Sequence, residues 1–285
     1  MRRALSCAAA MATAVTVLSA APQERFTSRA TGVRVDVLAL RGKLPAAGLQ
    51  VSDFEVRDNG VLQVVDAIEA QDLPVNVVLA LDISGSVEGG KLGDLTAAAR
   101  TLADGLTPRD RMALTTFTQR VRPLVGLTSD LSLVRSALER IRPSGTTALF
   151  DGLFVGVAAT LAEPGRSLVV ACTDGRDTAS WLTADEVRDA ARRANAVIYV
   201  VAAGAAATAG ELKDIAETTG GHVIAVRDAS AYRDELQRIL TEFRSRYVLS
   251  FTPTGVPAGG FHTLGVAVKQ RGVSVTARRG YFSDR

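Results

Sequence analysis

Residues 77–86 read Val-Val-Leu-Ala-Leu-Asp-Ile-Ser-Gly-Ser, so an apolar run at 77–81 is followed by side chains that carry oxygen. Asp82, Ser84 and Ser86 alternate at the end of this run, so one carboxylate and two hydroxyls share a single loop. Hard divalent cations such as Mg²⁺ and Mn²⁺ prefer ligand sets made of oxygen atoms. The segment therefore predicts one part of a site for such a cation.

Two later segments supply the oxygen atoms that such a site still needs. Residues 144–151 read Ser-Gly-Thr-Thr-Ala-Leu-Phe-Asp, and residues 169–175 read Val-Val-Ala-Cys-Thr-Asp-Gly. Each motif is weak by itself, but three of them in this order and at this spacing form a specific pattern. Together they resemble the metal-ion-dependent adhesion site of von Willebrand factor type A domains, and the resemblance covers roughly residues 75 to 240.

The resemblance implies a set of five metal ligands, namely Asp82, Ser84, Ser86, Thr147 and Asp174. Thr147 is preferred because the residues after it, Ala-Leu-Phe-Asp, match the helix start that follows the family's threonine, while Thr146 stays as the alternative. The family also implies Mg²⁺ or Mn²⁺ as the bound cation. An open coordination position would then capture an Asp or Glu carboxylate of a protein partner, which makes the domain a binding module and not an enzyme.

Three other interpretations of the same residues stay open. Asp82 and Ser84 are of types that cap turns without any metal. A cation could also act only as a structural staple between the loops of a scaffold protein. Finally, residues 85–91 fit Gly-x-x-x-x-Gly-Lys, the phosphate-binding P-loop pattern, between a predicted strand and a predicted helix. Leu92 replaces the hydroxyl residue that should follow Lys91, and Glu88 would place negative charge in the phosphate cradle, so nucleotide binding is disfavoured.

Residues for nucleophilic or general-base catalysis are scarce. The two histidines, His222 and His262, both lie in strand-like stretches and are expected to be structural. Asp177 and Thr178 follow the third motif and either orient that loop or are simply solvated. Trp181, the only tryptophan, lies in the same loop region. It either forms part of a partner-binding rim or packs at the start of a helix.

Between residues 77 and 245, short apolar runs alternate with stretches of helical periodicity. Runs such as 77–81 are apolar at successive positions, as strands of a parallel sheet are when helices cover both faces. The repeated strand–helix units predict an α/β fold with a doubly wound, mostly parallel sheet. Such sheets bind ligands beyond the carboxyl ends of their strands, where Asp82 and Asp174 both lie. Strands are expected at 76–82, 112–118, 167–173, 197–202 and 222–226, with 120–124 as a hairpin partner of 112–118. Helices are expected at 91–106, 131–141, 149–162, 184–194, 210–218 and 231–244.

The two flanks of this region are predicted to be β structure. Neither flank is long enough to bury a core alone. We therefore expect them to pair as one small antiparallel β-sheet domain, with the α/β domain inserted between them. Segments 53–60, 247–249 and 278–282 are similar to the flanks of a bacterial group of secreted von Willebrand-related proteins. Strands are expected at 33–40, 54–58, 62–68, 247–252, 263–270 and 273–277, with turns at 58–60 and 271–272.

The first residues have the pattern of a secretory signal. Arg2 and Arg3 precede an apolar stretch at 8–18 and small residues at 19–21. The expected location is therefore secreted or periplasmic. The predicted organisation is a signal peptide at 1–21, an N-terminal β segment at 22–72, a von Willebrand factor type A domain at 73–245 and a C-terminal β segment at 246–285.

The charge balance argues against nucleic-acid binding. The 285 residues include 33 basic and 30 acidic side chains, and loss of the signal would leave 31 basic ones and a net charge of +1. A near-neutral protein is a poor candidate for nonspecific attraction to nucleic acid. No later apolar stretch is long enough to cross a membrane, so none is expected in the mature chain.

Overall fold

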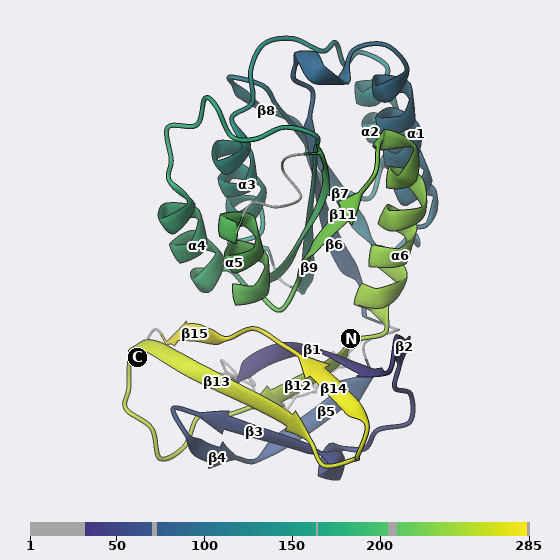
Figure 1. Cartoon of the computed structure of the whole chain (residues 1–285). Coiled ribbons are helices and arrows are strands. Elements are labelled where there is room, and N and C mark those ends of the chain that lie inside the picture. The colour runs from purple at the N-terminus through teal and green to yellow at the C-terminus, as the bar shows by residue number, and fades with distance from the viewer. Residues whose placement is uncertain (1–31, 70–72, 164, 205–209, 284–285) are drawn as a thin grey trace, which may run out of the picture. The chain divides into compact units, whose positions relative to one another are not determined.

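The structure is a computed structural model, and it describes residues 32–69, 73–163, 165–204 and 210–283 (Figure 1). The signal peptide predicted at 1–21 lies outside these residues. Within the described ranges, no helix combines the length and the apolar character that crossing a membrane requires.

A six-stranded sheet forms the centre of the α/β part, in the order β11-β10-β9-β6-β7-β8. Its strands are parallel except β8, which returns antiparallel to β7 as the predicted hairpin. The predicted doubly wound, mostly parallel sheet is thus confirmed. The strands span β6 Val75–Asp82, β7 Arg111–Phe117, β8 Val121–Thr128, β9 Arg166–Thr173, β10 Ala196–Ala203 and β11 Val223–Val226.

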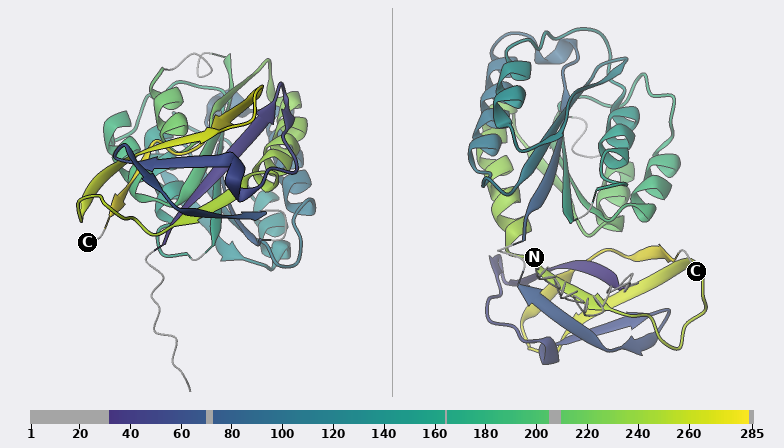
Figure 2. Two further views of the ribbon diagram at one scale, coloured as in Figure 1. Left: turned by 90° about the horizontal axis from the view of Figure 1, so that it is seen from below. Right: turned by 180° about the vertical axis from the view of Figure 1, so that it is seen from behind.

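Helices cover both faces of this sheet, and its central strands β6, β9 and β10 are therefore buried at every position. Alternate residues of β6 serve opposite cores. Val77 and Leu79 pack with α1, α2 and α6, whereas Val78 and Ala80 pack with α3, α4 and α5. Figures 1 and 2 show the same two helical layers. The helices span α1 Gly90–Asp104, α2 Leu131–Leu138, α3 Leu149–Ala158, α4 Ala184–Arg193, α5 Gly210–Thr218 and α6 Tyr232–Arg244.

Predicted and observed elements of the α/β part agree in type, and the main differences lie at the ends of α2, α3 and β8, which runs to Thr128 and not to residue 124. Helix α3 ends at Ala158, not at residue 162, and α2 ends at Leu138, not at residue 141. After α3 the Thr160 N–H donates to Val157 O at 2.9 Å, and the Thr160 hydroxyl donates to the same oxygen at 2.7 Å. This threonine closes the helix by a local contact that hydrophobic periodicity does not encode.

The flanks pair with each other in antiparallel fashion, as predicted, but they form two sheets and not one. The first runs β14-β1-β12-β5 with β2 paired to β1, and the second runs β15-β13-β3-β4. Residues of both sheets, including Val35, Phe54 and Leu249, share one hydrophobic core. The strands span β1 Val33–Arg41, β2 Leu44–Pro45, β3 Phe54–Asp58, β4 Val61–Gln63, β5 Val65–Glu69, β12 Tyr247–Phe251, β13 Gly260–Val268, β14 Val273–Thr276 and β15 Gly280–Ser283.

The single strand predicted at 62–68 is wrong, because the chain changes sheet within it. β4 ends at Gln63 and β5 begins at Val65, with the 89% exposed Val64 between them. Gln63 holds this point: its Nε2 donates to Thr254 O at 3.0 Å, and its Oε1 accepts from the Thr254 N–H at 2.9 Å. The contact joins residues 191 positions apart, so a local pattern cannot reveal it. Strands β2 and β15 also have no counterpart in the prediction.

The Asn-Gly turn between β3 and β4 follows its prediction. Asn59 and Gly60 have φ angles of 46° and 84°, both in the left-handed region. A two-residue hairpin turn of type I′ needs positive φ at both positions, which Asn and Gly adopt most readily. This turn sets the register in which Asp58 pairs with Val61.

Candidate metal site

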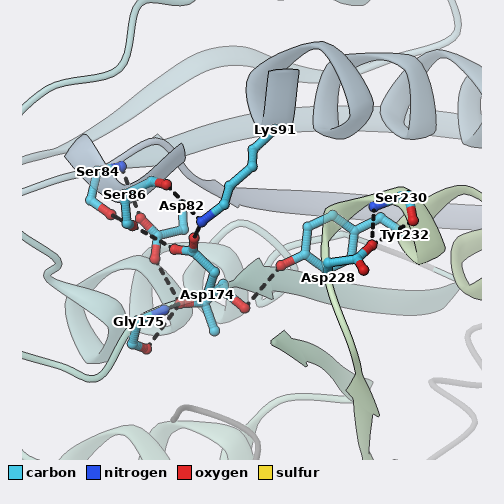
Figure 3. Close-up of polar contacts among 10 residues, drawn as sticks. Asp82, Ser84, Ser86, Lys91, Asp174, Gly175, Asp228, Ser230 and Tyr232 are labelled. Carbon is cyan, nitrogen blue, oxygen red and sulfur yellow. Dashed lines mark hydrogen bonds and ion pairs between the residues drawn. The ribbon is translucent and has the colours of Figure 1, made fainter. Parts of the chain in front are cut away.

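Asp82 is the last residue of β6 and is 1% exposed (Figure 3). Its Oδ1 accepts a hydrogen bond from the Ser84 N–H at 2.9 Å, and its Oδ2 accepts one from the Thr173 hydroxyl at 2.6 Å. Thr173 ends β9, which pairs in parallel with β6. The carboxylate is therefore held by the ends of two neighbouring central strands. Sequence reasoning did not single out Thr173, although its place beside Asp174 at the strand end is a usable signal.

Burial is the largest influence on the Asp82 carboxyl, and it raises the pKa of this group. The hydrogen bonds from Thr173 and Ser84 act in the opposite direction, and the negative charge of Asp174 adds to the rise. No ion pair to Asp82 occurs among the described residues. A nearby cation would favour the ionised form of such a carboxyl.

A chain of hydroxyl groups runs from the first loop to the third. Ser84 Oγ lies 3.0 Å from Ser86 Oγ, and the Ser86 hydroxyl donates to Asp174 Oδ1 at 2.6 Å. Ser84 is 2% exposed, whereas Ser86 faces solvent. The structure thus brings together four of the five predicted ligands through direct contacts, as Figure 3 shows.

Turn capping explains only part of this geometry. Asp82 does accept the Ser84 N–H, as in a local turn. Ser84, however, precedes the 3-10 turn η2 Gly85–Val87 without capping it through its side chain. The contacts Thr173–Asp82 and Ser86–Asp174 join residues 91 and 88 positions apart, which a local cap would not require.

The second loop brings Thr147, and not Thr146, to the same place. Thr147 is 6% exposed, whereas Thr146 is open to solvent. A Cβ atom built on Gly175 would lie 3.3 Å from Thr147 Oγ1 and 4.0 Å from Asp82 Oδ2. The absence of a side chain at Gly175 therefore leaves a space that these two oxygens border.

Asp177 and Thr178 orient the second loop against the third. The Thr178 N–H donates to Thr147 O at 2.9 Å, and the Thr178 hydroxyl accepts from the Thr147 N–H at 3.2 Å. Asp177 Oδ1 accepts from the Leu149 N–H at 2.8 Å, at the first residue of α3. A carboxylate at a helix N-terminus also interacts favourably with the helix dipole. Of the two roles that the sequence left open for these residues, the structure places them in the orienting one.

Lys91 contacts the same site from the first turn of α1. Its Nζ lies 3.0 Å from Asp174 Oδ2 and donates to the Ser86 carbonyl oxygen at 2.9 Å. The side chain is 51% exposed, while that of Asp174 is 9% exposed. A P-loop lysine reaches the phosphates of its nucleotide. This one is directed at a carboxylate and a carbonyl, which does not match the P-loop geometry.

The donor set fits a hard divalent cation. It consists of two carboxylates and three neutral hydroxyls, all of them oxygen donors. Across the part of the chain that the structure describes, no group of three or more His, Cys, Asp or Glu side chains is placed to hold a metal. A cation bound to this edge of the sheet would therefore depend on the hydroxyls of Ser84, Ser86 and Thr147.

The remaining candidate residues lie elsewhere or at the rim. His222 precedes the amino end of β11, opposite the edge that carries Asp82, and His262 lies in β13 of the flanking β structure. Trp181 lies in the third loop and is 92% exposed, so it does not pack at the helix start. Its N–H, together with that of Leu182, is bound by the Asp151 carboxylate.

Known proteins similar to this chain include von Willebrand factor type A domains. Residues 76–240, more than half of the chain, match the family model of the von Willebrand factor type A domain. An uncharacterized protein of Synechocystis sp. is 32% identical over 124 residues, and the pig inter-alpha-trypsin inhibitor heavy chain H2 is 29% identical over 144 residues. These alignments cover 41% and 46% of this chain but only 30% and 15% of the two relatives, respectively.

Two solved structures share the fold at low sequence identity. A von Willebrand factor type A protein from Catenulispora acidiphila superposes with a TM-score of 0.55 and 16% identity, covering 83% of this chain and 74% of that one. Proximal thread matrix protein 1 from the mussel byssus, solved with a zinc-occupied adhesion-site motif, gives a TM-score of 0.53 and 18% identity. It covers 67% of this chain and 50% of that one.

Proposed function

Because the chain belongs to the von Willebrand factor type A domain family, we propose that it binds Mg²⁺ or Mn²⁺ and, through this cation, an acidic side chain of a protein partner. Domains of this family are protein-interaction modules, often with a metal site, and are generally not enzymes. The ligands proposed for this chain are Asp82, Ser84, Ser86, Thr147 and Asp174.

The observation that supports the proposal most strongly is the convergence of three loops on one set of oxygen atoms. Three of the five donors are hydroxyls, and a cation held by neutral groups retains much of its charge for a further anionic ligand. The carboxylates of Asp82 and Asp174 would hold bound water or the cation itself. A partner's carboxylate would then complete the coordination.

Trp181 is the aromatic residue that we assign to the partner-facing rim. Its side chain is 92% exposed, while its backbone is fixed through Asp151. An exposed aromatic side chain on a fixed backbone offers a large contact area, and tryptophan is enriched among residues that dominate binding energy. Replacing Trp181 by Ala should weaken partner binding and leave cation binding unchanged.

The location is also a proposal. The basic, apolar and small-residue pattern at 1–21 supports secretion or residence in the periplasm. Expression of the full-length sequence should give a processed chain in the periplasmic or culture fraction, with its N-terminus at residue 21 or 22. An intact N-terminus on cytoplasmic protein would contradict it.

Titration calorimetry of MgCl₂ and MnCl₂ tests the metal site. The wild-type chain should bind one equivalent, and Asp82→Ala should bind none over the same range. Asp94→Ala is the matched control, since it removes one exposed carboxylate from α1 that forms no side-chain hydrogen bond or ion pair within the described residues. Equal binding by all three proteins would contradict the proposal.

A structural staple would behave differently from a capture site. Both would raise the melting temperature on addition of the cation, because a ligand that binds only the folded state stabilises it. Only a capture site would bind an Asp-containing peptide in Mg²⁺, lose it in EDTA, and ignore the same peptide with Asn. A cation that raises the melting temperature without allowing the protein to bind the Asp-containing peptide would favour the structural staple.

A further inference from the structure

Two adjoining cavities lie directly beside the proposed metal site. They measure about 390 and 110 Å³ and share four lining residues: Ile83, Thr116, Arg122 and Arg142. The larger falls within the range of about 300–1,000 Å³ that is usual for ligand pockets. Ile83 lies between Asp82 and Ser84 in the first loop, so the cavities and the metal site share a wall.

Backbone contacts make this wall continuous across two loops. The Ile83 carbonyl accepts the Ser144 N–H at 2.9 Å, and the Gly85 N–H donates to Gly145 O at 3.0 Å. Ser144 and Gln119 both line the smaller cavity. Gln119 packs so tightly on Gly145, which has a φ of 73°, that a Cβ there would lie 1.7 Å from its Oε1. The cavities are thus built against the loop that carries Thr147.

The cavities are lined by four arginines and by no acidic side chain. They come from two Arg-x-Arg segments, one around β8 at the edge of the sheet and one after α2. None of these arginines, Arg120, Arg122, Arg140 and Arg142, forms an ion pair with the described residues. Guanidinium groups gathered without a counter-charge favour an anion, and they bind carboxylates through paired hydrogen bonds.

The floor between the arginines is aliphatic. Leu124, Ala137 and Ile141 line the larger cavity together with Ile83. A free inorganic anion or a sulfated sugar would leave this floor uncovered, whereas a peptide can place an aliphatic side chain on it. The chemistry therefore favours a polypeptide in which acidic and aliphatic residues are neighbours.

We propose that these cavities bind a second part of the partner, an acidic segment with an aliphatic side chain, next to the carboxylate captured by the metal. The inference rests on the proposed function for its choice of a protein partner. The arginines would add affinity and orientation that do not depend on the cation. Two attachment points on one segment also raise the affinity above that of either alone.

The test uses the labelled peptide Glu-Leu-Glu-Leu-Glu-Asp and its counterpart Gln-Leu-Gln-Leu-Gln-Asn, with fluorescence anisotropy in Mg²⁺ and in EDTA. The variant is Arg122→Gln with Arg140→Gln, because neither side chain bonds to another described residue, and Arg109→Gln is the control at the opposite end of β7. We expect the double variant to bind the acidic peptide at least about tenfold more weakly in both buffers, since a lost bond to a charged group has roughly this effect.

The controls separate this inference from the proposed function. Asp82→Ala should weaken binding of the acidic peptide only in Mg²⁺. Arg109→Gln should bind this peptide with the affinity of the wild type in both buffers. If Asp82→Ala has no effect while the arginine variant weakens binding, the metal capture fails and the cavity proposal stands. Three results would each overturn the cavity proposal: equal affinity of the wild type and the arginine variant for the acidic peptide, equal affinity of the wild type for both peptides, or binding of a labelled heparin oligosaccharide by a wild-type protein that does not bind the acidic peptide.

Discussion

Asp82 and Asp58 are both almost completely buried, yet their surroundings differ in kind. Asp82 ends β6 in the α/β part and is 1% exposed, and Asp58 ends β3 in the flanking β structure and is 0% exposed. Asp58 Oδ1 lies 2.8 Å from His262 Nδ1, and its Oδ2 accepts the Tyr281 hydroxyl at 2.7 Å. Asp82 instead accepts the Thr173 hydroxyl and the Ser84 N–H, and it has no cationic partner among the described residues.

The partners decide what each carboxylate can do. His262 and Tyr281 are themselves buried, so the Asp58 cluster is closed, and even His262 Nε2 has no further partner within the described structure. Around Asp82 the chain of hydroxyls leads outward to the exposed Ser86 and to Lys91. A closed cluster joins strands, whereas one that opens to solvent can exchange a ligand. We therefore interpret the first as structural and the second as the binding site.

The largest expected effect is on stability at the closed cluster. Asp58→Ala should lower the free energy of unfolding by about 3–5 kcal/mol, because it leaves a buried histidine and a buried tyrosine without their hydrogen-bond acceptor. Urea unfolding followed by circular dichroism measures this, with Asp94→Ala as the control. A decrease in the free energy of unfolding of less than about 1 kcal/mol would contradict the interpretation of the Asp58 cluster as structural.

The next effect is the stabilisation that a cation provides. At a Mg²⁺ concentration of about 100 times Kd, the folded state should gain about 2.7 kcal/mol. This gain should persist in Asp58→Ala, if that variant folds, and vanish in Asp82→Ala. Thermal melts with Mg²⁺ or EDTA compare the three proteins. A cation response that survives in Asp82→Ala would remove this residue from the ligand set.

The choice between the two threonines gives an intermediate effect. Thr147→Ala should weaken cation binding by about 10- to 100-fold, as loss of a contributing group at a metal site commonly does. Thr146→Ala is the matched control, since its side chain is exposed, and it should change the affinity less than about twofold. Calorimetric titration decides between them, and the reverse order would restore Thr146 as the ligand.

The smallest effect has the opposite sign. Lys91 places a positive charge 3.0 Å from Asp174, where it opposes the approach of a cation. Lys91→Ala should therefore strengthen Mg²⁺ binding by about fivefold, because the repulsion is partly screened at this exposed position. Lys91→Arg keeps the charge and should not strengthen it. Weaker binding by Lys91→Ala would mean that the ammonium supports the site and does not compete with the cation.

Local pattern was sufficient for much of the α/β part. The doubly apolar runs predict β6 and β9, and parallel pairing of such strands places Asp82 and Asp174 at one edge. Helix α5 ends at the predicted residue, Thr218, and Asn59-Gly60 forms the predicted turn. These features depend on periodicity and on backbone preferences of single residues, which the sequence expresses directly.

Only the tertiary structure could decide how distant segments meet. Sequence alone favoured Thr147 but kept Thr146 as the alternative, and the structural difference between them is the burial of Thr147 beside Gly175. It gave no sign that Lys91 would lie on Asp174, nor that the arginines of 120–122 and 140–142 would line common cavities. The pairing of Asp58 with Tyr281 joins residues 223 positions apart. Such contacts depend on how sheets and helices pack together, and no window of local sequence carries that information.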